Sequence, residues 1–316
     1  MIIGRNRSEL GGACSAKMSG QVTGIPVAEA ATTAASRPSP VKIVRMGRFG
    51  AIVEGVDLRE PADGRAVRQL RDALAAFQLL LFRGQDISPH DQLRLTGYFG
   101  DLEPGIARRP GNHQVDGYPD LLHVRNAPGS PTLDYGSAWH SDGLAYAKTP
   151  HGATVLRCIA CPPGAGDTLF ANQYGAYNTV PETLRESLDG FRWYLPSIAH
   201  SEIPVGRGLT QPIFRTHPET KRRFVFLSPQ ASQIRGMTHA ESSRVLDVMH
   251  RCQVREEVIY RHAWQPGDVL VWENCALLHN RADAVDFATQ GLRAMHRSAT
   301  SGQFEAKECE SAPPCA

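Results

Sequence analysis

The sequence predicts a mainly β fold, a sandwich or barrel with helices packed on its outside. Short strand-like runs recur along the chain, at residues 79–82, 154–159, 224–227, 269–272 and 292–299. The 29 glycines and 22 prolines cluster between these runs, where turns are expected. Helical periodicity is limited to a few segments. Many short strands with this punctuation are typical of β sandwiches and barrels.

Three helices are expected among the strands. Residues 66–77 carry apolar side chains at helical spacing: Val67, Leu70, Leu74 and Phe77. Residues 89–99 form the second, because Ser88 suits the N-cap and Pro89 suits the first turn. The third follows Thr238 and runs from residue 240 to about residue 252.

The ends of the chain differ from its middle. Residues 1–40 are rich in Ala, Ser, Gly and Thr and show no sustained period, so we expect a mobile leader. Residues 303–316 are expected to form a mobile tail. Residues 41–302 then form one compact domain, for which α+β, mainly β, is the predicted class.

Composition limits the partners. The 34 basic and 32 acidic residues give a net charge of +2, so charge offers no reason to bind nucleic acid or a membrane surface. We find no apolar stretch long enough to span a membrane and no signal peptide. The seven cysteines are then expected to be free thiols in a cytoplasmic protein. Cys158 and Cys161 could hold zinc, but the absence of a second such pair favours buried thiols.

The sharpest local motif is Trp139-His140-Ser141-Asp142. On a strand, His140 and Asp142 would point to the same face, where an imidazole and a carboxylate can chelate a divalent metal. His279 is the candidate third ligand. Two histidines and one carboxylate leave three positions open, as in non-heme Fe(II) oxygenases. Taken alone, the first pair also fits a surface strand or turn, and His279 fits a structural histidine.

Other polar residues accompany this motif. Arg293 and Arg297 lie four apart on a predicted strand, so both guanidiniums share a face. If that face is buried, the pair needs anions, and a carboxylate held by an arginine fork is the natural partner. The alternative is a solvated face. Thr168, after the turn 164–167, opens a strand and could donate to a carboxylate, although a turn threonine is the simpler interpretation.

In combination, these motifs resemble the family of Fe(II)- and 2-oxoglutarate-dependent dioxygenases that includes taurine dioxygenase and 2,4-dichlorophenoxyacetate dioxygenase. The resemblance covers residues 41–301 and is carried by an ordered series. The series is 50–58, 81–85, 98–102, 139–142, 166–168, 215–218, 264–268, His279 and 293–297. It implies a double-stranded β-helix (a cupin-like jelly roll). Members often form homo-oligomers, and this chain could do the same, although no sequence feature shows the contact.

The resemblance also implies roles. His140, Asp142 and His279 look like the iron ligands, and Thr168 and Arg293 like the groups that hold the far carboxylate of 2-oxoglutarate. With Fe(II), 2-oxoglutarate and O2, the family oxidises unactivated C–H bonds. The presence of Asp142 disfavours a halogenase. Arg297 matches the position that binds the acidic head group of the substrate in the taurine enzyme.

The substrate side departs from the taurine enzyme. Gly136 stands where that enzyme has an asparagine, and the segment 143–146 is less bulky. Tyr135, Leu144 and Arg297 are the predicted substrate contacts, with plain packing as the alternative for the first two. We expect a small-molecule carboxylate or sulfonate. Tailoring of a natural product, such as a terpenoid or an amino-acid derivative in antibiotic biosynthesis, is slightly favoured over sulfonate or aryloxyalkanoate catabolism.

Two other classes stay open. A non-catalytic jelly-roll binding protein would have the fold without the chemistry, but the complete ligand set argues against it. A zinc hydrolase fits poorly, because zinc sites favour three histidines or His/Cys sets and no general base is evident beside the metal.

Overall fold

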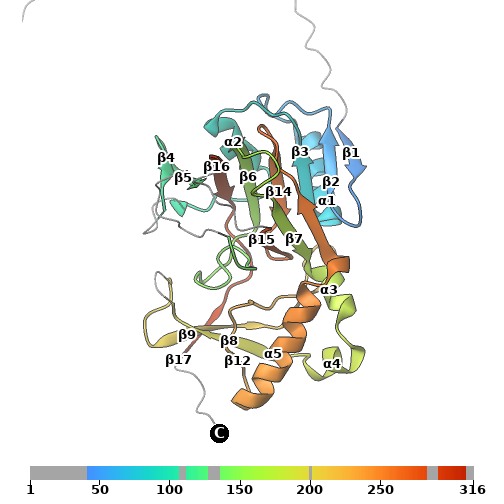
Figure 1. Ribbon diagram of the computed structural model, residues 1–316, viewed down its shortest axis with the longest axis vertical. Helices are drawn as coiled ribbons and strands as arrows, with labels where there is room; N and C mark the ends of the chain where they lie inside the picture. The colour runs from blue at the N-terminus through green and yellow to red at the C-terminus, as the bar shows by residue number, and fades with distance from the viewer. Residues whose placement is uncertain (1–40, 107–111, 127–135, 199–200, 283–290, 311–316) are drawn as a thin grey trace, which may run out of the picture. The chain divides into compact units, whose positions relative to one another are not determined.

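The computed structural model describes residues 41–106, 112–126, 136–198, 201–282 and 291–310 (Figure 1). Residues 39–316 belong to one compact unit. The expected leader lies outside the described residues. Within the described part, no helix is both long and apolar enough to cross a membrane.

The largest sheet has eight strands in the order β1-β2-β3-β14-β6-β16-β5-β4. Their bounds are β1 Lys42–Arg45, β2 Ala51–Glu54, β3 Leu79–Phe82, β14 Val269–Glu273, β6 Ala153–Ala160, β16 Arg293–Ala299, β5 Tyr118–Asn126 and β4 Gln114–Val115. β14 lies between β3 and β6 and is antiparallel to both. The strands expected from the apolar runs 79–82, 154–159, 269–272 and 292–299 are therefore confirmed.

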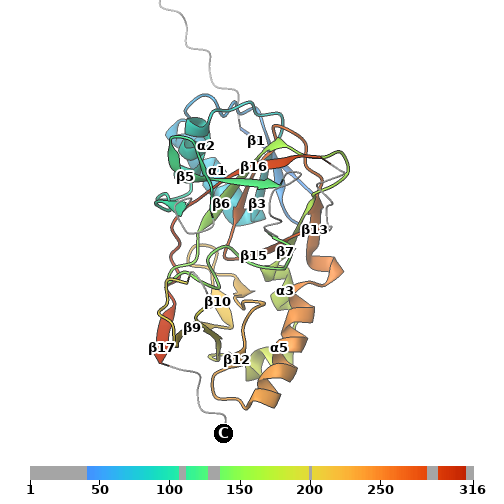
Figure 2. The same ribbon diagram turned by 60° about the vertical axis from the view of Figure 1, so that its left-hand side comes forward.

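A smaller sheet faces this one and makes the fold a jelly roll. It contains β13 (Ile259–His262), β7 (Thr168–Asn172) and β15 (Leu277–Arg281), with β7 in the middle. Apolar side chains from both sheets form a shared core, including Phe170, Leu270, Trp272, Leu277 and Met295. Figures 1 and 2 show β7 and β15 between the large sheet and the rest of the unit.

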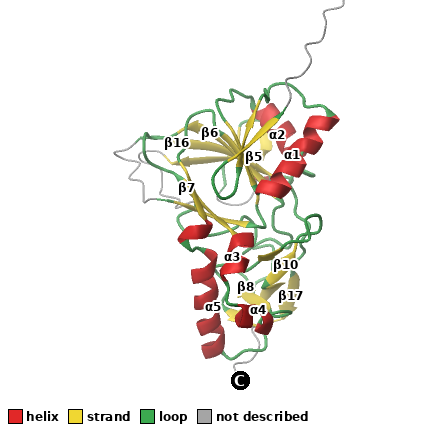
Figure 3. Ribbon diagram, turned by 90° about the vertical axis from the view of Figure 1, so that its right-hand side faces the viewer, coloured by secondary structure: helices red, strands yellow, loops and turns green. Residues whose placement is uncertain are grey.

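Two helices cover the other face of the large sheet, as Figure 3 shows. α1 (Gly64–Phe77) begins after the N-cap Asp63, and α2 (Pro89–Gly97) begins after Ser88, which forms a capping box with Asp91. Because both faces of the sheet are covered, β14 is apolar throughout its first four residues. Its alternate residues Val269 and Val271 face the helices, and Leu270 and Trp272 face the small sheet.

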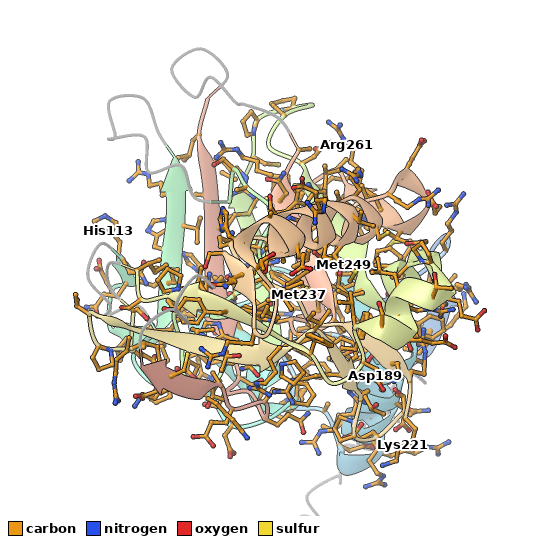
Figure 4. The ribbon with its side chains drawn as sticks, turned by 90° about the horizontal axis from the view of Figure 1, so that it is seen from below. His113, Asp189, Lys221, Met237, Met249 and Arg261 are labelled. Atoms are coloured by element: carbon orange, nitrogen blue, oxygen red, sulfur yellow. The ribbon has the colours of Figure 1, made fainter. Side chains whose placement is uncertain are left out.

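The remaining elements form a second hydrophobic cluster. A four-stranded sheet has the order β12 (Gln233–Ile234), β8 (Arg192–Pro196), β9 (Arg207–Pro212) and β17 (Lys307–Glu310). β10 (Phe214–Thr216) pairs with β11 (Arg223–Val225). The helices are α3 (Gln173–Thr179), α4 (Glu182–Ser187), α5 (His239–Gln253) and the 3-10 turn η2 (Glu256–Val258). Met249 of α5, labelled in Figure 4, is fully buried here, and Thr238 caps α5.

The expected tail boundary differs from the structure. Residues 307–310 form β17, which pairs antiparallel with β9, so the folded domain extends past residue 302. The sequence did not predict this strand because it is short and polar and shows no alternation of apolar and polar residues. Its Glu308 accepts ion pairs from Lys148 and Arg207 instead of burying an apolar side chain.

Ending the chain at Ala306 should lower stability, because β9 loses its β17 ladder and the Glu308 ion pairs. Four paired residues predict a loss of roughly 2–4 kcal/mol in the free energy of unfolding, or about 5–10 °C in the melting temperature. Thermal unfolding of this truncation, compared with one that ends at Glu310, measures the effect. Equal melting temperatures would show that β17 adds nothing.

Candidate metal centre and cosubstrate site

Two candidate metal ligands, 139 residues apart in sequence, are directly paired. His140 and His279 form an isolated antiparallel bridge. The His140 amide donates to the His279 carbonyl at 3.0 Å, and the His279 amide donates back at 2.8 Å. Their rings lie 4.1 Å apart between centroids. His279 belongs to β15, so the small sheet holds one ligand and fixes the other.

Asp142 reaches the same point from a turn and not from a strand, which corrects the expected local structure. The side chain of Asn274 holds this turn. Its Oδ1 accepts from the Asp142 amide at 2.9 Å, and its Nδ2 donates to the Asp142 carbonyl at 2.8 Å. Ser141 Oγ donates to the Asn274 carbonyl. Asn274 is fully buried, so the loop after β14 locks the backbone of the ligand turn.

The three side chains converge on one point. Their candidate ligand atoms all lie within 4.8 Å of one another. Asp142 Oδ1 is 4.0 Å from His140 Nε2, and Asp142 Oδ2 is 3.9 Å from His279 Nε2. In the described part of the chain, this is the one group of three such residues that could hold a metal ion.

The electrostatics suit a divalent cation. Burial alone would raise the pKa of Asp142, but Arg297 and the two imidazoles hold that pKa well below its usual range. Burial, with His140 beside it, lowers the pKa of His279 to about 3, so its imidazole is neutral at physiological pH. His140 Nδ1 lies 2.8 Å from the Ala138 carbonyl, a contact that favours the tautomer with Nε2 free to bind a metal. An ionised carboxylate and the neutral imidazole of His279 fit Fe(II).

Arg293 is a buried cation with no carboxylate beside it among the described residues. Its side chain lies on β16 and is 6% exposed. Its Nε donates to the Gly166 carbonyl at 3.2 Å. Burial lowers the pKa of Arg293 to about 10, so the guanidinium stays charged at neutral pH. Such a group requires an anion, as a cosubstrate carboxylate would supply.

Gly166 allows Arg293 to reach this position. Its φ is +77°, in the left-handed region, and a Cβ there would lie 3.0 Å from Arg293 Cδ. The sequence placed Gly166 in a turn and in the motif 166–168, but it did not predict its contact with Arg293. Only glycine combines this backbone conformation with such a close approach.

Arg297, four residues along β16, is placed differently. Its Nη1 donates to Asp142 Oδ1 at 2.7 Å. Arg297 therefore already has an internal carboxylate partner in the structure. Leu144 is 3% exposed and packs in the second hydrophobic cluster, so its contact with substrate stays a prediction. Tyr135 lies outside the described residues.

The cysteine pair is not organised as a zinc site in the described part of the chain. Cys158 is buried in the core between the two sheets, and Cys161 Sγ donates to the Trp264 carbonyl at 3.3 Å. Both thiols are free, as expected.

The fold and the site define a class: a jelly-roll protein with a His-Asp-His centre suited to non-heme iron. The chain belongs to the family described as taurine catabolism dioxygenase TauD, TfdA, whose profile matches residues 36–299. It is an Fe(II)- and 2-oxoglutarate-dependent dioxygenase that uses O2.

Relatives show how varied this family is. The 2,4-dichlorophenoxyacetate dioxygenase of Cupriavidus pinatubonensis is 29% identical over 253 residues, which cover 73% of this chain and 88% of that protein. Pentalenolactone F synthase of Streptomyces avermitilis is 24% identical over 279 residues, covering 77% and 89%. The crystal structure of a taurine dioxygenase from Burkholderia xenovorans superposes with a TM-score of 0.74 at 28% identity, covering 86% and 96%.

Replacing His140 or Asp142 by Ala should abolish Fe(II) binding at this centre and, with it, succinate formation from 2-oxoglutarate. Each change removes one of the three candidate ligands that the described residues offer. Metal titration and succinate assays measure both effects, and His239→Ala, an exposed histidine at the start of α5, is the control. Near-normal succinate formation by either variant would refute the ligand assignment.

Proposed function

We propose that the chain oxidises an unactivated C–H bond of a small-to-medium carboxylate-bearing substrate, with His140, Asp142 and His279 as iron ligands. The observation that carries this proposal is Arg293, a buried cation on the strand that also carries Arg297 of the metal centre, with no carboxylate beside it in the described part. The oxidation is hydroxylation, desaturation or a further step of the same kind.

The chain's own residues then have separate tasks. Bound iron, 2-oxoglutarate and O2 together would supply the oxidising power for C–H cleavage. Arg293 and Thr168 would hold the far carboxylate of 2-oxoglutarate and so set the direction of its metal-binding end. The apolar core between the sheets, with Phe170 and Trp272 against His279, would keep water from the ligand side.

Arg297 would bind the acidic group of the substrate. Its side chain is 16% exposed and already contacts the metal ligand Asp142, so an acid bound there would lie next to the centre. A carboxylate or a sulfonate would satisfy the guanidinium equally.

Natural-product tailoring is the use that we favour, and the similarity to pentalenolactone F synthase supports it. Catabolism of a sulfonate or an aryloxyalkanoate is the second candidate, and it is supported by the similarity to the 2,4-dichlorophenoxyacetate enzyme.

The cosubstrate side is tested by anaerobic titration of the protein with Fe(II) and 2-oxoglutarate, followed by the weak visible charge-transfer band of the chelate. The wild type should develop the band. Arg293→Ala should raise the 2-oxoglutarate concentration needed by roughly a hundredfold or more, because a buried charged partner is lost. Arg261→Ala, which removes a more exposed arginine of β13, is the matched control. An unchanged requirement in Arg293→Ala would refute its role.

Arg297→Ala should weaken binding of the prime substrate far more than binding of 2-oxoglutarate. A panel of carboxylic and sulfonic acids is screened for perturbation of the same band in the wild type, and the active acids are repeated with the variant. In the variant, we expect the concentration of acid needed to perturb the band to rise roughly tenfold or more. The concentration of 2-oxoglutarate needed to develop the band should change less than about threefold. Fe(II) is kept saturating because Arg297 also contacts Asp142. Equal losses for both ligands would reassign Arg297 to the cosubstrate.

A further inference from the structure

The Thr168 hydroxyl has a fixed hydrogen-bond partner that sequence reasoning did not identify. Trp264 Nε1 donates to Thr168 Oγ1 at 2.9 Å, and both side chains are buried. The two residues are 96 positions apart. Trp264 lies in the loop between β13 and β14, and Thr168 is the first residue of β7.

The direction of this bond matters because an indole N–H can only donate. Trp264 therefore donates to one lone pair of Thr168 Oγ1 and cannot accept the hydrogen of the Thr168 hydroxyl. Within the described part of the chain, no other hydrogen bond involves this hydroxyl. The Thr168 hydrogen thus remains available to an acceptor from outside the protein, such as a carboxylate.

Trp264 is itself held in place. Its ring meets His262 edge-to-face, with centroids 4.5 Å apart and planes at 86°. The fully buried His262 is fixed by Asp268 Oδ2, 3.1 Å from its Nε2. Arg83 completes this support with an ion pair to the same oxygen. The indole therefore has little freedom to turn away from Thr168.

We propose that Trp264 is a positioning residue that sets the Thr168 hydroxyl as a donor to the far carboxylate of 2-oxoglutarate. This inference rests on the proposed cosubstrate site. Thr168 and Arg293 then present two donors to the same anion from β7 and β16, and Trp264 removes the rotational freedom of one of them. A carboxylate, which only accepts, is recognised by such a pair.

The test measures binding without turnover, with Mn(II) as a redox-stable replacement for Fe(II) and isothermal titration calorimetry as the readout. Two probes are compared: 2-oxoglutarate, and 2-oxobutanoate, which has the same chelating end without the far carboxylate. Trp264→Phe should raise the Kd of 2-oxoglutarate about threefold to tenfold, the effect of one hydrogen bond, and leave that of 2-oxobutanoate unchanged.

A double-mutant cycle separates positioning from general damage. In a Thr168→Val background, Trp264→Phe should have no further effect on 2-oxoglutarate, because the hydroxyl that it orients is already absent. Trp193→Phe is the control. It removes another buried indole N–H, which donates to the Phe226 carbonyl in the second cluster. Both probes should bind Trp193→Phe as they bind the wild type.

The outcomes are distinct. If the wild type does not bind 2-oxoglutarate, the proposed cosubstrate site fails. If the wild type binds and Trp264→Phe weakens both probes equally, or has the same effect in the Thr168→Val background as alone, the positioning role is wrong. Should the Trp264→Phe variant fail to fold, the benzothienyl analogue of tryptophan is placed at position 264. It keeps the two-ring shape and removes only the N–H donor, so the Kd values of both probes can still be compared with those of the wild type.

Discussion

The buried carboxylate of Asp142 is the constraint on which the rest of this site depends. At 2% exposure, an ionised carboxylate is costly unless charges and donors surround it. Arg297 of β16 and Thr154 of β6 donate to its two oxygens, and His279 of β15 lies beside it. Both donors lie on neighbouring strands of the large sheet, and His279 comes from the small sheet. The closed jelly roll therefore places the charge-compensating groups and the candidate ligands around the same carboxylate.

The two arginines of β16 show why the centre also needs an external anion. Arg297 is matched by Asp142, whereas Arg293 has only a backbone carbonyl partner in the described part of the chain. Burial of Arg293 lowers its pKa only to about 10, so neutralisation by proton loss does not occur at physiological pH. The free-energy cost of removing the Arg293 guanidinium from water is incurred when the protein folds, before any ligand binds. An arriving dicarboxylate would then gain a preorganised charge without reorganising the protein, which favours both affinity and a fixed orientation.

Features specified by local sequence could be predicted, and features specified by long-range contacts could not. The helix after Ser88 follows from its cap, and β14 follows from an uninterrupted apolar run that is buried on both faces. The grouping of His140, Asp142 and His279 was expected from motifs. The bond from Trp264 to Thr168 and the clamp of Asn274 on the ligand turn join residues 96 and 132 positions apart, and no local pattern encodes them. β17 was missed because edge pairing, without an apolar face, specifies it.

The remaining buried carboxylates bear on the choice between oxidation and hydrolysis at this centre. A hydrolytic metal site can use a carboxylate as a general base for the metal-bound water. In the described part of the chain, Asp167 is paired with Arg261, and Asp268 with Arg83 and His262. Glu273 accepts from Tyr174 and lies 3.1 Å from His217 Nε2. Every buried acid of that part outside the centre therefore already has a partner. Arg293, by contrast, is a buried positive charge without a carboxylate partner in the same part of the chain. A site whose other buried acids are engaged, and which holds the buried cation Arg293, can receive an acid, as a dioxygenase that consumes a 2-oxo dicarboxylate requires.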